Sequence, residues 1–348
     1  MKYADIKNRE NVLKLRELTA PLPPFVMDFF RGIEHKTATR TRIAYAYDLN
    51  VFFRFLVNEP TPLQGREISS IQVEELDKIR ALELEQYIEY IKYYKSDEDD
   101  TEHVNGARGI KRKIASIKSF YKYFYHMEMI KTNPAELIEM PKLTEKTIIR
   151  LDPDEVAMLL DTIEGGEELT AKQQEYHKKT VTRDLALITL LLGTGIRVSE
   201  CVGLNMKDVD FKNGCISIIR KGGKEANVYF GDEVDNALAM YMEQREGMIP
   251  CTGHEEALFL SLQLKRMSVR SVENLVKKYA SIVNPIKPIT PHKLRSTYGT
   301  NLYRETGDIY LVADVLGHSD VNTTRKHYAA TDEDQRRLAR NKVKLRKD

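Results

Sequence analysis

The sequence contains nothing that would place the chain in a membrane or in a disulfide-bonded compartment. No apolar run approaches the roughly 20 consecutive residues that a transmembrane helix needs, and the first residues, MKYADIKNREN, lack the apolar stretch of a signal peptide. The cysteines, Cys201, Cys215 and Cys251, are odd in number and show no CxxC spacing, which favours reduced thiols over disulfides or zinc ligands. We therefore expect a soluble, cytoplasmic protein.

The usual signatures of nucleotide and metal cofactors are also missing. The chain has no Walker A loop, no GxGxxG motif, no internal repeat and no convincing metal-binding cluster of Asp and Glu residues. We therefore expect a protein that works without a cofactor.

Acidic residues are absent from one strongly basic stretch of an otherwise balanced chain. The formal net charge is +2, yet Val104–His126 contains six Lys and Arg and no acid, and the tail from Arg325 holds nine Lys and Arg against four acids. Part of the balancing acid lies in Asp97–Glu102. Such a basic face indicates a polyphosphate partner such as nucleic acid, although many charge runs are only solvated helix faces.

The length of 348 residues exceeds what one hydrophobic core usually supports, so we expect two domains. The first half is predicted to be almost entirely helical. Apolar residues recur at helical spacing in Thr37–Asn58, one or two helices are expected in 75–96, and an apolar stripe follows from Ile110 to Phe124.

A proline-containing segment, Asn133–Glu155, marks the domain boundary. Its three prolines interrupt any long helix, and Asp152 followed by Pro153 is typical of a helix start. The expected divisions are an N-terminal helical domain at 1–140, a linker at 141–150 and a second domain at 151–348.

The second domain is predicted to combine helices with one β-hairpin. Arg183–Gly195 has the pattern of a buried helix closed by glycine, and CISIIRKGGKEANVYF has two β-branched runs joined by Gly-Gly. A helix is expected after Ser268 as its N-cap, and Pro291–Tyr328 is predicted to be helical with breaks at glycines 299, 307 and 317. The fold class is therefore mainly α with a small β-hairpin or sheet, an α+β fold.

Four short segments of this domain contain residues suited to catalysis: TGIRVSE, RKGGKE, TPHKLRST and LGHSDVNTTRKHY. The candidates in them are Arg197, Lys221 with Lys224 nearby, His292, Arg295, His318 and Tyr328. Each also has an ordinary explanation. Arg197 could bind the last carbonyls of the preceding helix, a lysine could decorate the turn, and Tyr328 could be a core aromatic.

Together these side chains suit the attack of a tyrosine oxygen on a phosphodiester. Two guanidiniums match the equatorial oxygens of a five-coordinate phosphorus, where negative charge develops. A lysine on a hairpin can protonate the leaving 5′ oxygen, and imidazoles can bind the phosphoryl oxygens. Dense positive charge would also lower the pKa of the phenol, which is about 10 in isolation.

In this order the motifs resemble those of the tyrosine recombinase/integrase family, most closely its Xer-like members. TGIRVSE, TPHKLRST and LGHSDVNTT carry the resemblance in the second domain, and IKRKIASIKSFYKYFYHMEMIKTNPAE resembles the last helix of the family's core-binding domain and its exit. The resemblance implies a role for each candidate: Arg197 and Arg295 as phosphate clamps, Lys221 as general acid, His292 and His318 as further pocket residues, Tyr328 as nucleophile, and Glu200 as support for Arg197.

The resemblance also implies a fold, a reaction and partners. An N-terminal core-binding domain and a C-terminal catalytic domain would clamp double-stranded DNA at a specific site, and four protomers would assemble on two sites with the C-terminal tail docked on a neighbour. Cleavage would leave a 3′-phosphotyrosyl link, for Xer-like recombination or for integration and excision of a mobile element. The candidate DNA contacts are Arg108, Lys111, Arg112, Lys118 and Arg270.

The sequence departs from the Xer pattern in one spacing, and it leaves three alternatives. His318 and Tyr328 are ten positions apart, one more than is common in Xer members, so that His327 occupies the usual position of the tyrosine. A type IB topoisomerase would use the same chemistry as a monomer, and a non-catalytic relative would bind DNA without cleaving it. A zinc hydrolase would use His254, His292, His318 and His327, whose spacings fit no familiar zinc site.

Overall fold

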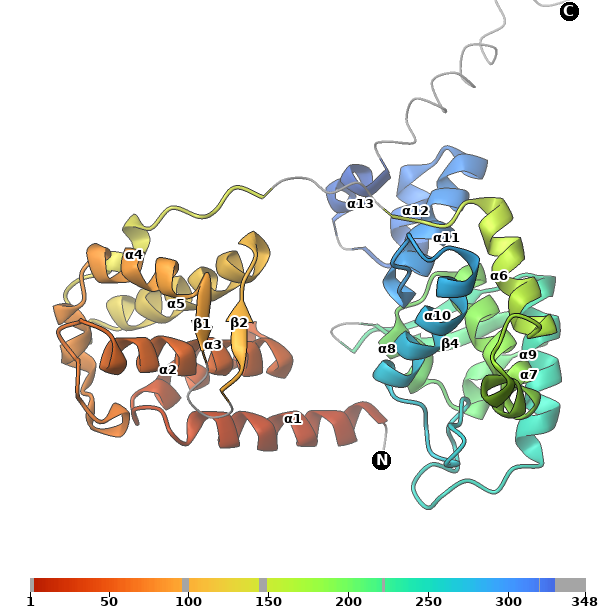
Figure 1. Cartoon of the computed structure of the whole chain (residues 1–348), viewed down its shortest axis with the longest axis horizontal. Coiled ribbons are helices and arrows are strands. Elements are labelled where there is room, and N and C mark those ends of the chain that lie inside the picture. The colour runs from red at the N-terminus through yellow and green to blue at the C-terminus, as the bar shows by residue number, and fades with distance from the viewer. Residues whose placement is uncertain (1–2, 96–99, 144–148, 221–222, 319, 329–348) are drawn as a thin grey trace, which may run out of the picture. The chain divides into compact units, whose positions relative to one another are not determined.

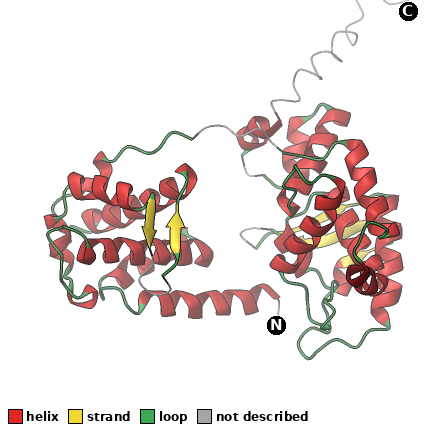
Figure 2. Cartoon of the chain, in the orientation of Figure 1, coloured by secondary structure: helices red, strands yellow, loops and turns green. Residues whose placement is uncertain are grey.

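The computed structural model describes residues 3–95, 100–143, 149–220, 223–318 and 320–328. The chain divides into two compact units, Met1–Glu145 and Lys146–Asp348. Both are dominated by helices and each has short antiparallel strands (Figures 1 and 2). The predicted fold class, mainly α with a small sheet, is confirmed.

The first unit consists of helices and one two-stranded ribbon. Its elements, with η for short 3-10 helices, are α1 (Tyr3–Thr19), α2 (Val26–Gly32), η1 (Glu34–Lys36), α3 (Thr39–Asn58), η2 (Ile68–Ser70), η3 (Val73–Lys78), α4 (Ala81–Tyr90), β1 (Tyr93–Lys95), β2 (Glu102–Val104), α5 (Ala107–His126) and η4 (Pro134–Leu137). The helices predicted around Thr37–Asn58 and along the basic stretch are present as α3 and α5.

An aromatic core holds α2, α3 and α5 together. Phe29, Phe53 and Phe120 are fully buried, and the ring of Phe120 meets those of Phe29 and Phe53 edge-on, at centroid distances of 5.3 and 5.9 Å. Every member of the apolar stripe from Ile110 to Phe124 is buried. The basic residues of α5 are therefore left on the remaining faces of the helix.

The first half is not entirely helical, because Tyr93–Lys95 forms β1 where we predicted helix. This strand pairs antiparallel with β2, with Tyr94 opposite His103. The Tyr94 ring stacks on the rings of Tyr90 and His103, at centroid distances of 5.4 and 4.9 Å. Tyrosines fit a pleated strand as well as a helix, and the partner strand begins at Glu102, the last residue of the acidic segment, where helical spacing gives no sign of it.

The second unit contains a three-stranded antiparallel sheet among its helices. Its elements are α6 (Pro153–Gly165), α7 (Ala171–Thr194), α8 (Val198–Gly203), η5 (Met206–Asp208), β3 (Val209–Asp210), β4 (Cys215–Ile219), β5 (Glu225–Tyr229), α9 (Asp232–Glu246), α10 (Val269–Val283), α11 (Pro291–Thr306), α12 (Ile309–Leu316) and α13 (Val321–Tyr328). The predicted hairpin is present as β4 and β5, and β3 adds a strand on the other side of β4 that we did not predict.

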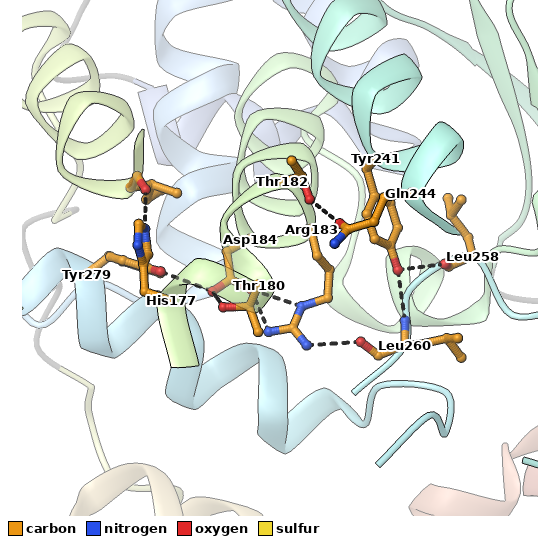
Figure 3. Close-up of polar contacts among 11 residues, drawn as sticks. His177, Thr180, Thr182, Arg183, Asp184, Tyr241, Gln244, Leu258, Leu260 and Tyr279 are labelled. Carbon is orange, nitrogen blue, oxygen red and sulfur yellow. Dashed lines mark hydrogen bonds and ion pairs between the residues drawn. The ribbon is translucent and has the colours of Figure 1, made fainter. Parts of the chain in front are cut away.

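Helix α7 packs against α6, α9 and α11. A buried polar network fixes its middle (Figure 3). Arg183 donates to Asp184 Oδ1 at 2.9 and 2.6 Å and to the carbonyl of Leu260 at 3.0 Å. Asp184 also accepts from the hydroxyls of Thr180 and Tyr279, each at 3.0 Å. Because Tyr279 lies on α10, this network ties α7 to α10.

Several helix ends lie where the sequence predicts them. Asp152 precedes α6, and the Ser268 hydroxyl accepts from the first turn of α10 at 3.0 Å. Gly307 and Gly317 break the chain of helices, with φ of 65° and 64°. The predicted break at Gly299 is wrong, since this residue is buried inside α11. A glycine costs a helix only about 1 kcal/mol relative to alanine, which the packing of α11 against α7 outweighs.

Cys201 and Cys215 are buried and Cys251 is half-buried, and all three are free thiols. Among the described residues, no helix combines the length and the apolar character that crossing a bilayer requires.

Candidate active site

The end of α7 is closed by a tight turn at Gly195. Its φ of 61° lies in the left-handed region, and a Cβ atom here would lie 2.4 Å from Cδ1 of Tyr298 and 2.9 Å from Cδ2 of Leu316. Glycine is therefore required both for the conformation and for the close approach. Tyr298 belongs to α11 and Leu316 ends α12, so this turn brings three separate segments of the second unit together.

Arg197 follows this turn and is the N-cap residue of α8. Its backbone N–H donates to Glu200 Oε2 at 2.7 Å, and its guanidinium donates to Glu200 Oε1 at 2.8 Å. The Arg197 side chain is 37% exposed whereas that of Glu200 is 6% exposed. A second guanidinium nitrogen of Arg197 lies 3.4 Å from the carbonyl oxygen of Gly317. The buried carboxylate thus orients an arginine whose guanidinium reaches the surface.

Arg295 joins the turn at Gly195 to the turn at Leu316–Gly317. It lies on the second turn of α11 and is only 5% exposed. One guanidinium nitrogen donates to the Gly195 carbonyl at 2.6 Å and the other donates to the Leu316 carbonyl. The carbonyl directly after α7, at Gly195, is therefore bound by Arg295. Because an arginine fork presents its donors in a fixed plane, this side chain also fixes the distance between the two turns.

His318 connects the second turn to α13. Its Nδ1 lies 2.7 Å from Oγ1 of Thr324, which is fully buried on α13, and its backbone N–H donates to the Ala313 carbonyl at 2.8 Å. Sequence reasoning missed Thr324. It lies in the NTT of the LGHSDVNTT segment, but nothing in its spacing distinguishes it from the neighbouring threonine.

The remaining catalytic candidates are placed less fully. His292 is exposed and lies one turn before Arg295 on α11. Tyr328 is the last residue of α13, one helical turn after Thr324, and its side chain lies outside the description. Lys221 is not among the described residues. The structure therefore brings Arg197, Arg295 and His318 together where the C-terminal ends of α7 and α12 meet the beginning of α11. The backbone of position 328 lies on α13, the helix that follows.

Nothing in the described part of the chain supports a zinc centre. No group of three or more His, Cys, Asp or Glu side chains there is arranged to hold a metal ion. The Nδ1 atom of His254 accepts the backbone N–H of Arg266 at 3.2 Å, which is an ordinary structural contact.

The candidate DNA contacts differ in how they are held. Arg108 is exposed, and Lys111 and Lys118 are half-buried. Arg270 is exposed on α10 and lies 3.3 Å from Glu273. These residues are open to the surface to different degrees, and their contact with DNA stays a prediction.

Arg112 is engaged by a buried carboxylate. Its guanidinium donates to Asp48 Oδ2 at 2.7 Å, and Asp48 is fully buried. Lys113, which is 5% exposed, and the Ser116 hydroxyl contact the same carboxylate at 3.3 and 3.1 Å. Burial raises the pKa of Asp48, against the opposing effect of Lys113 and Arg112, and burial lowers the pKa of Lys113. Arg112 therefore has a structural partner that the basic stretch does not reveal.

Comparison with known proteins places the chain in a family. The Phage integrase family profile matches residues 150–335. A tyrosine recombinase XerC from Caldanaerobacter subterraneus subsp. tengcongensis is 34% identical over 337 residues, covering 93% of this chain and 87% of the relative. A tyrosine recombinase XerD from Staphylococcus epidermidis is 33% identical over 219 residues, which are 63% of this chain and 70% of the relative.

Solved structures show the same fold. The XerH site-specific recombinase bound to its difH substrate matches with a TM-score of 0.61 and 21% identity, covering 83% of this chain and 76% of that one. The Tn1549 transposon integrase in complex with circular intermediate DNA matches with a TM-score of 0.62 and 21% identity, covering 86% and 93%. Neither the topoisomerase nor the non-catalytic alternative is favoured by these relatives. The chain belongs to the phage integrase family of tyrosine recombinases, enzymes that cleave and rejoin DNA strands in site-specific recombination.

Proposed function

We propose that Tyr328 is the nucleophile of this reaction and that Arg197 and Arg295 bind the phosphate it attacks. One observation carries the assignment. Two arginines from separate segments of the chain converge on the turn at Leu316–Gly317, which leads through His318 into the helix that ends at Tyr328. Guanidiniums fixed before the substrate arrives stabilise charge in the transition state without reorganising.

In the proposed step the Tyr328 oxygen forms a bond to phosphorus as the bond to the 5′ oxygen breaks. The phenol releases its proton to solvent, and Lys221 gives a proton to the departing 5′ oxygen. The product is a 3′-phosphotyrosyl link and a free 5′-hydroxyl. The 5′-hydroxyl of a partner duplex then attacks this link, passes its proton to Lys221 and releases the tyrosine, which regains a proton from solvent. One phosphoester replaces another in each step, so neither ATP nor a cofactor enters the balance.

The other candidates act around this centre. His318, held through Nδ1 by Thr324, would present Nε2 to a phosphoryl oxygen, and His292 would face the phosphate from the same helix as Arg295. Glu200 orients Arg197 through both its backbone and its side chain. These residues would hold one phosphate from several directions, which is what an in-line displacement requires.

The proposed substrate is double-stranded DNA with a specific recombination site. Two similar structures are of recombinases bound to DNA substrates, XerH on difH and the Tn1549 integrase on circular intermediate DNA. By this similarity we propose that the first unit binds DNA through α5 and its neighbours. We also propose that four protomers assemble on two sites, with the tail after Tyr328 contacting a neighbour. Because the proposed substrate is DNA, we also propose that the reaction takes place in the cytoplasm.

The test begins with covalent capture. The protein is incubated with nicked duplexes that carry a randomised segment, and the covalent adducts are recovered and sequenced to obtain the site. Wild type should form an adduct and Tyr328→Phe none, whereas Tyr310→Phe, which alters a tyrosine 71% exposed on α12, should react like wild type.

Mass spectrometry then identifies the attacking residue. Trypsin should release the adduct on HYAATDEDQR, residues 327–336, in which Tyr328 is the sole tyrosine. An acid-stable adduct on this peptide is expected of phosphotyrosine. An acid-labile adduct would instead assign the link to His327, and an adduct on another peptide would overturn the assignment.

A further inference from the structure

Arg220 reaches from the β4–β5 hairpin to the end of α12. Its two terminal guanidinium nitrogens donate to the carbonyls of Asp314 and Val315, at 3.2 and 2.8 Å. These carbonyls belong to the last turn of α12, where no further helical N–H follows to bind them; that of Asp314 also accepts the Gly317 N–H at 2.8 Å. An arginine from a segment more than ninety residues earlier therefore caps this helix.

The contact belongs to a larger arrangement. Four successive carbonyls, from Asp314 to Gly317, receive guanidinium nitrogens: Arg220 binds the first two, Arg295 the third and Arg197 the fourth. The C-terminal end of a helix carries partial negative charge, which attracts cations. Arg197 and Arg295 belong to the proposed phosphate site, whereas no role has been assigned to Arg220.

The strand directs Arg220 to this place. Side chains alternate along β4, and Ile216 and Ile218 are buried while Ser217 and Ile219 are exposed. Position 220 continues the buried series, which sends the arginine inward. Its backbone N–H also donates to the Lys224 carbonyl at 2.8 Å, at the turn end of the hairpin.

The opposite side of the contact is shaped to receive the guanidinium. A Cβ atom at Gly317 would lie 1.7 Å from an Arg220 terminal nitrogen and 2.5 Å from Cζ. Gly317 also has a φ of 64°, so this glycine serves both the turn before His318 and the close approach of Arg220.

We propose that Arg220 is a positioning residue that locks the β4–β5 hairpin onto the α12 end, so that the hairpin delivers its proton to the leaving 5′ oxygen. The inference rests on the proposed function, because Lys221, the next residue in the chain, is the proposed general acid. A hairpin released from α12 would still allow DNA to bind, but its acid would be misplaced.

The test uses two leaving groups at the scissile position of the captured site. One duplex has the normal 5′ oxygen, and the other has a bridging 5′ sulfur. An alkoxide needs a proton to leave, whereas a thiol has a pKa of about 8.5 and leaves as the thiolate. Single-turnover cleavage and DNA affinity are measured for wild type, Arg220→Ala, Arg220→Lys, Lys221→Ala and Lys212→Ala, which alters an exposed lysine in the turn before β4.

Arg220→Ala should cleave the oxygen substrate about 10²-fold more slowly than wild type, the loss typical of a misplacement of about 1 Å. The sulfur substrate should recover most of this loss, as it should for Lys221→Ala, and DNA affinity should stay within about twofold. Arg220→Lys, which keeps the charge but not the two-pronged contact, should show a smaller loss with the same recovery. Lys212→Ala should match wild type on both substrates.

Equal losses on both substrates would show that Arg220 only supports the fold, and full activity on oxygen would show that it is not needed; either result overturns the proposal. If Arg220→Ala does not fold, Arg220→Lys decides the question by the same comparison. The proposed function is tested separately, because wild type and Tyr328→Phe report on the nucleophile without reference to Arg220. If wild type forms no adduct, both proposals fail.

Discussion

Arg112 in the first unit and Arg295 in the second are held by oxygens of different kinds. Arg112 binds the buried carboxylate of Asp48, with Lys113 on the other oxygen. Arg295 binds the carbonyls of Gly195 and Leu316. A carboxylate offsets part of the charge of the cations that it binds, whereas a carbonyl fixes the position of a guanidinium and leaves its charge. The first arrangement suits a carboxylate buried in a helical bundle, and the second suits a site that must meet a phosphate.

This difference explains why the basic residues of α5 and those of the glycine turns cannot be interpreted alike. Both sets contain a guanidinium that is bound by an oxygen of its own unit. What separates them is the acceptor, which lies far away in the sequence in each case: Asp48 for Arg112, and the α12 end for Arg295.

The largest expected effect is on the stability of the first unit. Asp48→Ala leaves Lys113 buried without its carboxylate, and breaking such a pair costs about 3–5 kcal/mol. The measurement is hydrogen exchange of the α3 and α5 amides under increasing urea. Asp48→Leu with Lys113→Met should restore much of the loss, since apolar replacement of a buried pair is often neutral. A cost below about 1 kcal/mol for Asp48→Ala would contradict the assignment of this carboxylate as the partner that Lys113 needs.

The next effect compares the two arginines directly. Arg295→Lys keeps the charge but loses the planar fork, and the rate of single-turnover cleavage should fall about 10²–10³-fold, as when one preorganised donor is lost. Arg112→Lys makes the same chemical change beside Asp48 and should leave the rate at saturating DNA unchanged. Similar losses for both would mean that the kind of acceptor does not separate catalytic from structural arginines.

The sequence is sufficient to predict the elements whose cause is local. The hairpin of β4 and β5, the N-cap at Ser268 and the breaks at Gly307 and Gly317 all follow from turn and capping residues beside them. The break expected at Gly299 fails because packing of α11 overrides the local preference. The strands β1 and β3 were missed since each depends on pairing with a segment beyond its own neighbourhood.

The residues of the candidate site also divide into those that the sequence predicts and those that it does not. Motif order identifies Arg197, Arg295 and His318, and the structure brings them to one turn. No pattern in RKGGKE distinguishes Arg220 from the lysines beside it, because its partners are two carbonyls of α12. Roles that rest on a side chain's own chemistry can be predicted from sequence, and roles that rest on a distant backbone acceptor cannot.

A smaller effect on stability is expected at Gly317, beside the arginines that backbone carbonyls bind. Gly317→Ala imposes both a left-handed backbone and a clash with Arg220, and should destabilise the second unit by about 1–3 kcal/mol. In the Arg220→Ala background the clash is gone, so the stability cost of Gly317→Ala should fall by about 1 kcal/mol in a double-mutant cycle of thermal unfolding.

Gly195→Ala is the matched control, because its clash is with Tyr298 and Leu316. Its cost should be the same in both backgrounds, and coupling of equal size at both glycines would remove Arg220 from the explanation.

The smallest effect concerns a cation held by carboxylates near the surface. Lys287 lies 2.6 Å from Glu155 and 3.2 Å from Asp152. Burial tends to raise the pKa of Glu155, but hydrogen bonds from Lys287, the Asp152 N–H and Asn284 lower it overall. The hydrogen bond with Glu155 also raises the pKa of Lys287.

A carboxyl group whose pKa is lower in the folded state stabilises the fold at pH values above its unfolded pKa of about 4.3. That contribution is lost as the pH falls through the folded pKa. Since both side chains are partly solvated, Glu155→Gln should cost about 0.2–1 kcal/mol at neutral pH, and less in high salt. The free energy of unfolding is measured in urea by tyrosine fluorescence, and the difference between Glu155→Gln and wild type should disappear in acid. A difference that persists in acid would mean that the glutamate contributes packing and not charge.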